Sequence, residues 1–202
     1  MQINLLGIPG TGTTYLARRL SVSMGLPLLS MAHTAGAGEY RVQTDNQIVN
    51  AILDQIQRSG IRNGFVLSGF PTTLPQARSL DQMLAWQGVP VTRAVLLRLP
   101  KATLLQRIQG RRCCVECGEG INLALPDMAN TTQCPFCGAA LEIPRSANDI
   151  SDEQILAAAE RRYIRLGRYY RSQNKLLPVD ITGAADTDLV KLQEALKRRN
   201  RL

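Results

Sequence analysis

Short apolar runs alternate along this chain with segments that have the period of an amphipathic helix, and this alternation restricts the fold more than any other feature. Four runs have the composition of buried strands and lie at residues 2–6, 65–67, 94–99 and 176–181. Apolar residues at helical spacing mark helices around residues 16–24, 48–56, 80–84, 104–108 and 189–196. Strands that alternate with helices form a parallel sheet covered on both faces. The sequence therefore predicts an α/β protein with a doubly wound parallel sheet.

Two segments interrupt this alternation. The stretch from Ser30 to Tyr40 is rich in glycine and small residues and has no apolar period, which indicates a loop. Residues 112–149 contain all five cysteines and three prolines, which predict a compact insert instead of a core element. After the insert, Ser151 and Gln154 have the spacing of a capping box, so we expect a long helix that runs to about residue 173.

The chain has 202 residues, of which 45% are hydrophobic, and this is enough for one globular domain with its own core. Its formal net charge of +8 attracts polyanions such as nucleotides, RNA or an anionic membrane surface, and charge alone does not choose among them. Residues 1–6 run directly into the first strand, and no apolar stretch has membrane-spanning length. We therefore expect a cytoplasmic monomer that is not bound to a membrane.

The cysteines form the strongest single motif. Cys114 and Cys117 make one Cys-x-x-Cys pair, and Cys134 and Cys137 make a second pair after sixteen residues. Two such pairs supply four thiolates for a tetrahedral zinc ion, and a site with four sulfur ligands is closed to substrate and therefore structural. Two disulfides or free thiols are the alternative. Cys113 is the odd thiol, and it could replace Cys114 if the register shifts by one residue.

A glycine-rich loop follows the first strand and precedes the first helix. Its residues are Gly7, Ile8, Pro9, Gly10, Thr11, Gly12, Thr13 and Thr14. In this position glycines allow backbone N–H groups to converge on phosphate oxygens at the N-terminus of a helix. The position after Gly12 that carries lysine in a phosphate loop is Thr13 here, so the loop lacks that charge. The alternative is a glycine turn that serves only close packing of strand and helix.

Several motifs together resemble the adenylate kinases, in particular the long-lid form that binds zinc. They are GIPGTG, TDNQIVNAIL, NGFVLSGFPTTLPQA, LLQRIQGRR, the paired Cys-x-x-Cys insert and VDITGA, in the order of the family and over nearly the whole chain. The resemblance implies a P-loop nucleoside monophosphate kinase fold. It divides the chain into core segments 1–29, 45–111 and 150–202, a shortened AMP-binding region at 30–44 and a zinc lid at 112–149.

The resemblance also implies nucleotide contacts outside the loop. Arg107 matches the family arginine that lies along the adenine of ATP, and Arg111 matches the one that reaches its phosphates. Gln76 matches the glutamine that reads the adenine of AMP. The backbone near Gly183 and Ala184 matches a second adenine contact. The implied ligand is ATP, with or without magnesium.

The departures from the family pattern concern charge. Thr13 stands in place of the phosphate lysine, Thr72 in place of an arginine, and Ser68 in place of an aspartate that helps to position magnesium. Tyr15 stands in place of a metal-binding threonine. The motif T-G-D-M-L-R, whose arginine grips AMP, has no counterpart in the segment after Ser30. Beyond the insert, the family's R-x-D-D reads Arg-Ser-Ala-Asn at residues 145–148.

These losses decide the expected function. Phosphoryl transfer depends on positioning and charge neutralisation, and a single arginine can contribute ~10³ to 10⁵ in rate. We therefore expect an adenylate-kinase-like protein that is impaired as a kinase, binds adenine nucleotides weakly on the ATP side, or has a regulatory role with another protein. One alternative is an active, divergent nucleoside monophosphate kinase.

A second alternative is a basic module that binds RNA or a ribonucleoprotein. Tyr163, Tyr169 and Tyr170 lie among arginines in the segment RRYIRLGRYYR, where aromatic rings could stack on bases. The other interpretation is that the tyrosines pack on the sheet and the arginines form a solvated face.

Overall fold

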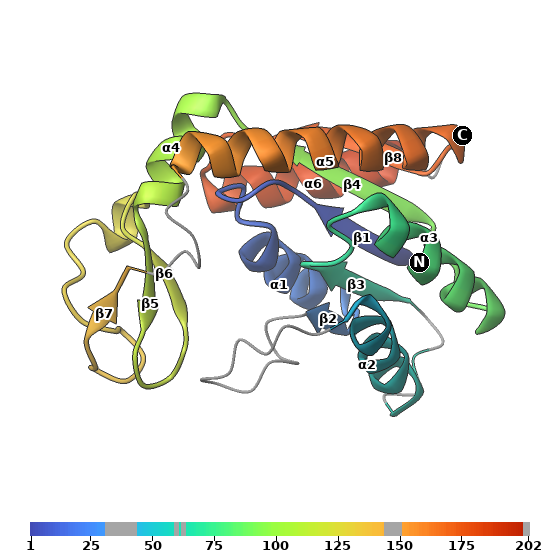
Figure 1. Ribbon diagram of the computed structural model, residues 1–202, viewed down its shortest axis with the longest axis horizontal. Coiled ribbons are helices and arrows are strands. Elements are labelled where there is room, and N and C mark those ends of the chain that lie inside the picture. Colours follow the sequence, from blue (N-terminus) through green and yellow to red (C-terminus); the bar gives the residue numbers. More distant parts are fainter. Residues whose placement is uncertain (31–43, 59–60, 62–63, 144–150, 200–202) are drawn as a thin grey trace.

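The computed structural model describes residues 1–30, 44–58, 61, 64–143 and 151–199. Its centre is a five-stranded sheet with the order β2-β3-β1-β4-β8, in which every neighbouring pair is parallel (Figure 1). The strands are β1 (Gln2–Leu6), β2 (Leu28–Ser30), β3 (Phe65–Ser68), β4 (Arg93–Arg98) and β8 (Leu176–Asp180). The predicted parallel sheet is confirmed. The sequence pattern did not indicate β2, because a strand of three residues is too short to show a period.

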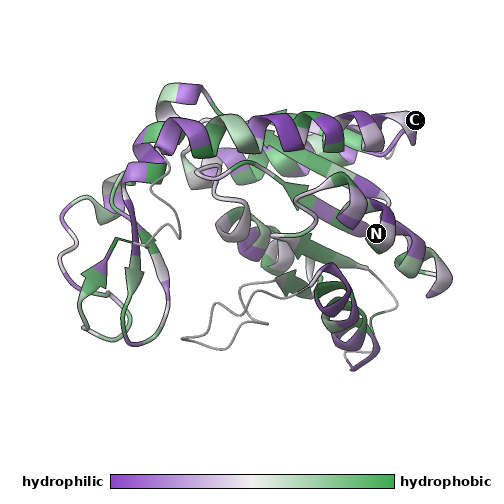
Figure 2. Cartoon of the chain, in the orientation of Figure 1, coloured by the Kyte–Doolittle hydropathy of each residue, from purple (hydrophilic) through white to green (hydrophobic). Residues whose placement is uncertain are grey.

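Helices cover both faces of this sheet, as the alternation predicts. They are α1 (Thr13–Met24), α2 (Asp45–Arg58), α3 (Leu74–Trp86), α4 (Lys101–Gln109), α5 (Asp152–Ser172) and α6 (Ala185–Arg199). Buried residues of α1 and α6 pack on one face, whereas those of α2, α3 and α5 pack on the other. Figure 2 shows hydrophobic residues concentrated in the strands and polar residues on the outer helix surfaces.

Two helices begin with a capping box. At α5 the side chain of Ser151 accepts a hydrogen bond from the amide of Gln154, and the Gln154 side chain returns a bond to the Ser151 amide, as predicted. At α3 the pair Thr73 and Gln76 makes the same arrangement. The sequence signal for this second box was present, because threonine and glutamine have the required spacing there and Pro75 lies in the first turn.

The cysteine-rich insert folds as a separate three-stranded antiparallel sheet at one end of the molecule (Figure 1). Its strands are β5 (Arg111–Cys114), β6 (Gly120–Asn122) and β7 (Leu141–Glu142), and a short 3-10 helix, η2, spans Pro126–Met128. Among its described residues, those from 112 to 143, three hydrophobic residues are buried, namely Cys114, Ile121 and Cys134. A core of this size is too small to stabilise a fold by apolar burial alone.

Some predictions lie outside the described residues. The shortened AMP-binding region at 30–44 overlaps them only at its two end residues, and the segment 145–148 lies entirely outside. In the ranges that the structure describes, no helix is both long enough and apolar enough to span a bilayer.

The tyrosines of α5 face the protein interior. Tyr170 is fully buried, and Tyr163 and Tyr169 pack partly buried against the same core. The ring of Tyr169 meets that of Tyr170 edge to face, with centroids 5.1 Å apart. The arginines of the helix are exposed; these are Arg161, Arg162, Arg165, Arg168 and Arg171. Packing on the sheet, and not base stacking, therefore accounts for these aromatic residues.

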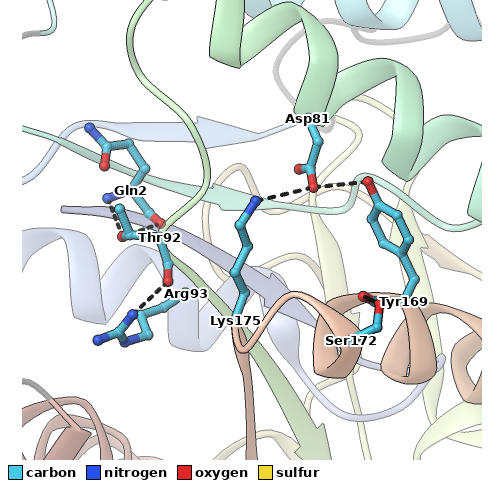
Figure 3. Close-up of polar contacts among 7 residues, drawn as sticks. All are labelled: Gln2, Asp81, Thr92, Arg93, Tyr169, Ser172 and Lys175. Carbon is cyan, nitrogen blue, oxygen red and sulfur yellow. Dashed lines mark hydrogen bonds and ion pairs between the residues drawn. The ribbon is translucent and has the colours of Figure 1, made fainter. Parts of the chain in front are cut away.

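A buried carboxylate joins α3 to α5. Oδ2 of Asp81 accepts a hydrogen bond from the hydroxyl of Tyr169 at 3.1 Å and lies 3.5 Å from Nζ of Lys175 (Figure 3). Burial raises the pKa of the Asp81 carboxyl above its ordinary value, and the charge of Lys175 opposes that rise. The three side chains thus form one polar cluster under the contact between the two helices.

Gly64 offers a test of how tightly the N-terminus is packed. Its φ is +125°, and a Cβ there would lie 2.2 Å from the carbonyl oxygen of Met1. Gly88 also has a positive φ, +73°, but a Cβ there would meet nothing within 4 Å. We expect Gly88→Ala to cost about 1 kcal/mol of unfolding free energy from backbone strain, and Gly64→Ala to cost at least about 1 kcal/mol more because backbone atoms must move. Urea unfolding of both variants checks this, and equal losses would contradict it.

Candidate nucleotide and metal sites

The glycine-rich loop joins the carboxyl end of β1 to α1. Gly10 and Gly12 have φ values of 93° and 75°, which residues with a side chain rarely adopt. A Cβ on Gly7 would lie 2.2 Å from Oγ1 of Thr11. The Thr11 hydroxyl is buried and donates to the carbonyl of Ile8 at 2.8 Å. The glycines are therefore required for a tight loop that closes around Thr11, while Pro9 at its tip is exposed.

The N-terminus of α1 is open to an anion. Its N-cap, Gly12, supplies no side-chain hydrogen bond, and the first turn, which begins with Thr13 and Thr14, holds no acidic residue. The first N–H groups of a helix have no partner within the helix, and the helix dipole favours negative charge there. Ser68, the last residue of β3, is paired with Leu5 in the sheet. Its hydroxyl is buried and has no hydrogen-bond partner among the described residues.

Arg107 connects the glycine loop to the loop that follows β8. On α4, its Nη1 donates to the carbonyl of Gly10 at 3.2 Å, and its Nη2 donates to the carbonyl of Gly183 at 2.8 Å. A Cβ on Gly183 would lie 2.8 Å from Nη2, so glycine is required for this approach. Burial lowers the pKa of Arg107, and Asp188 opposes the shift. Asp188 also accepts from the amides of Thr182 and Gly183, which holds this second loop in place.

The other predicted nucleotide contacts are more scattered. Arg111 is the exposed first residue of β5, at the point where the insert leaves the core. Ala184 is exposed and follows Gly183. The structure therefore brings Arg107 and the Gly183 loop to the glycine loop, whereas Arg111 lies toward the insert.

Gln76 is occupied by contacts within the protein. Its Oε1 accepts from the amide of Thr72 at 2.7 Å and from the Thr72 hydroxyl at 3.0 Å. Its Nε2 donates to Oδ1 of Asp45 at 2.7 Å, which links α3 to α2. These bonds make Gln76 part of the cap of α3 in this structure, and its role in reading a base stays a prediction.

The replaced charges leave neutral groups around the loop. Thr13 is half-buried at the start of α1, and Thr72 is half-buried within the cap of α3. Tyr15 is 53% exposed, and Arg19 lies 5.9 Å from the centre of its ring. These positions supply hydroxyl groups and an aromatic ring in place of the lysine, arginine and metal-binding threonine of the family pattern.

The four paired cysteines converge on one point. The sulfur atoms of Cys114, Cys117, Cys134 and Cys137 all lie within 4.8 Å of one another. Two of the separations are 3.4 Å, between Cys114 and Cys137, and 3.6 Å, between Cys117 and Cys134. A tetrahedral zinc ion with metal–sulfur distances of ~2.3 Å places its ligands about 3.8 Å apart, so the donor set fits such an ion. All five cysteines are free thiols. Cys113 lies outside the group, and its sulfur contacts the carbonyls of Cys114 and Gly118.

Each cysteine pair forms a turn that closes on a glycine. The amides of Gly118 and Gly138 donate to the carbonyls of Cys114 and Cys134, at 3.1 and 2.8 Å. Both glycines have positive φ. The amide of Cys117 donates to the sulfur of Cys114 at 3.5 Å, and this bond contributes most to lowering the pKa of Cys114 to about 6. The amides of the two glycines thus bond to carbonyl oxygens and complete the turns.

A parallel sheet with a glycine loop at the N-terminus of α1 defines a P-loop protein of the nucleotide-kinase type. The profile of the AAA domain family matches residues 6–114. The adenylate kinase of Nitrosococcus oceani is 31% identical over 201 residues, which cover 89% of this chain and 91% of that protein. The adenylate kinases of Clostridium perfringens and Agathobacter rectalis are 29% and 27% identical, over 91% and 92% of this chain and 93% and 94% of theirs. The chain belongs to the adenylate kinase family.

The cysteine geometry predicts one metal ion per chain. Changing Cys134 to serine removes a buried ligand, so we expect elemental analysis to show that the variant loses the metal. The insert should then unfold in a separate, earlier transition because its apolar core is small. The matched control is Cys113→Ser, which should retain both the metal and a single transition. Equal metal content in the two variants would contradict the assignment.

Proposed function

We propose that this protein is an adenylate-kinase-like protein that binds adenine nucleotides weakly on the ATP side and transfers phosphate poorly. The observation that carries the proposal is the contrast between the residues predicted to bind ATP and the residues predicted to bind AMP. The ATP side retains the glycine loop, the open N-terminus of α1 and Arg107, which holds that loop. On the AMP side, Gln76 is bonded to Thr72 and Asp45. The neutral residue Thr72 stands there in place of an arginine, and Ser68 stands in place of the aspartate that helps to position magnesium.

Each surviving group has a defined part in binding. The N–H groups around Gly12 and Thr13 would donate to phosphate oxygens, and the buried hydroxyl of Ser68 would supply one further polar contact. Arg107 keeps the Gly10 and Gly183 carbonyls at fixed positions, which orders the two loops between which a base would lie. Thr13 supplies no positive charge to the phosphates. Charge neutralisation in the transition state is therefore weaker than in the family pattern.

We further propose that the metal at the insert is zinc and that it is structural. Four thiolates satisfy the tetrahedral preference of zinc and leave no position for water or substrate. Zinc supplies a cross-link between the two cysteine turns, and the residues that hold it are Cys114, Cys117, Cys134 and Cys137. The insert then acts as a rigid lid element that begins at Arg111.

The first test of this function is turnover. In a coupled assay with ATP, AMP and magnesium, we expect activity to be absent or lower by several orders of magnitude than an ordinary turnover number of ~1 to 10³ per second. Thr13→Lys should not restore it, because the AMP side still lacks its arginine. The adenylate kinase of one of the relatives serves as the positive control. A turnover number in the ordinary range would instead support an active, divergent kinase.

The second test is ligand preference, measured by titration calorimetry. We expect ATP to bind more tightly than AMP, with little dependence on magnesium, because the groups that survive belong to the ATP side. Arg107→Gln should weaken ATP binding at least ~10-fold, since the loss of charge-assisted bonds of about 1.5–3 kcal/mol releases both loops. Arg58→Gln, an exposed change on α2, is the control for loss of one charge. Tighter binding of AMP, or a steep rise of ATP affinity with magnesium, would contradict the proposal.

A further inference from the structure

A surface pocket lies between α3 and α5, apart from the glycine loop. Its volume is about 330 Å³, and no residue of the glycine loop lines it. The lining residues are Leu74, Arg78, Arg165, Arg168, Tyr169 and Ser172. Three of these six are arginines, one from α3 and two from successive turns of α5. The side chains of all three arginines belong to exposed residues.

Within the described ranges, none of the ion pairs involves Arg78, Arg165 or Arg168. Three like charges around one pocket repel one another, and an anion relieves that repulsion. The charge of the lining therefore favours a ligand with negative charge.

The carboxylate that bonds to Tyr169 already has a cationic partner. Asp81 is only 9% exposed, and it accepts from the Tyr169 hydroxyl and pairs with Lys175 (Figure 3). The same bond to Asp81 holds Tyr169, which forms one wall of the pocket. Ser172, on the next turn of α5, adds a hydroxyl to the lining. The potential in the pocket is therefore set by the arginines.

The guanidinium group selects among anions. Its planar fork of donors matches the oxygens of phosphate, and several arginines together favour a ligand with more than one negative charge. Of the other exposed arginines of α5, Arg161 lies on the same side of the helix as Arg165 and Arg168, at a spacing of four and seven residues. A ligand with several linked phosphates can contact both the pocket and Arg161, whereas a single carboxylate cannot.

We propose that Arg78, Arg165 and Arg168 form a second phosphate-binding site, distinct from the glycine loop. The ligand is a chain of phosphate groups, carried either by a free polyphosphate anion or by the backbone of an RNA strand. The site is argued independently of the proposed nucleotide function, because none of the residues that line its pocket belongs to the glycine loop.

The experiment uses the full chain and two probes. Tripolyphosphate is titrated by calorimetry, and a fluorescent 20-nucleotide single strand of polyuridylate is followed by anisotropy at several salt concentrations. In the triple variant Arg78→Gln, Arg165→Gln, Arg168→Gln, we expect at least tenfold weaker binding of the probe that represents the true ligand. If that probe is RNA, the slope of log affinity against log salt should fall by about 2, since each phosphate contact contributes ~0.7.

A second triple variant separates a site from net charge. Arg18→Gln, Arg58→Gln and Arg198→Gln remove the same number of charges from exposed residues on α1, α2 and α6. This control should bind both probes as the unchanged protein does, apart from a small common loss. Circular dichroism checks that both triple variants are folded. The single variant Arg165→Gln should show a smaller loss of probe binding than the first triple variant.

The outcomes decide both the site and its ligand. If the first triple variant loses binding of tripolyphosphate and the control variant does not, the result supports a site for a free anion. Loss of only the RNA signal in the first triple variant supports a site for the RNA backbone. Equal losses in the two triple variants, or no binding of either probe at millimolar tripolyphosphate and micromolar RNA, would overturn the proposal. Failure of the nucleotide proposal is distinguished by titrating tripolyphosphate in the presence of excess ATP, which occupies the glycine loop, so that the remaining signal and the RNA signal report on the second site.

Discussion

The rest of the structure depends on the need to cover both faces of the central parallel sheet. Within β1, Ile3 and Leu5 pack against the core under α1 and α6, whereas Leu6 packs against the core under α2, α3 and α5. Helices must therefore occupy both faces, and polar groups with a chemical role remain only at the edges. The glycine loop, Ser68 and the Gly183 loop all lie at the carboxyl edge for this reason.

At that edge, the residues that hold the backbone differ from the positions that would supply charge to a phosphate. Arg107 is retained at a position where it bonds to two loop carbonyls, so its loss would disturb the backbone as well as any ligand. The hydroxyl of Thr72 instead became part of the α3 cap, and Ser68 is buried without strain on the sheet register. Arg107 thus has structural bonds in this structure, whereas Thr72 and Ser68 are neutral at positions where the family pattern is charged. This contrast supports the proposal of binding without efficient transfer.

The cysteine-rich insert and helix α5 differ in how they are held. In the described part of the chain the insert has a small apolar core, and four sulfur atoms that could hold a metal ion converge beside it. Helix α5, in contrast, is anchored by buried residues such as Leu166 and Tyr170. Its arginines can therefore be exposed without cost to the core. The carboxylate of Asp81 is already paired with Lys175.

The sequence by itself determined the parallel sheet, the coverage of both faces, the α5 capping box and the cysteine ligand set, because periodicity and spacing are local properties of the chain. It did not indicate β2 or the strands of the insert, which are too short to carry a period. The cap that Gln76 forms has a local signal, but only the tertiary structure decided that its side chain also bonds to Asp45. Likewise, only the packing of α3 on α5 brought Arg78 to Arg165 and Arg168. These last two arrangements join residues distant in sequence, and no local pattern encodes which side chains a fold will place together.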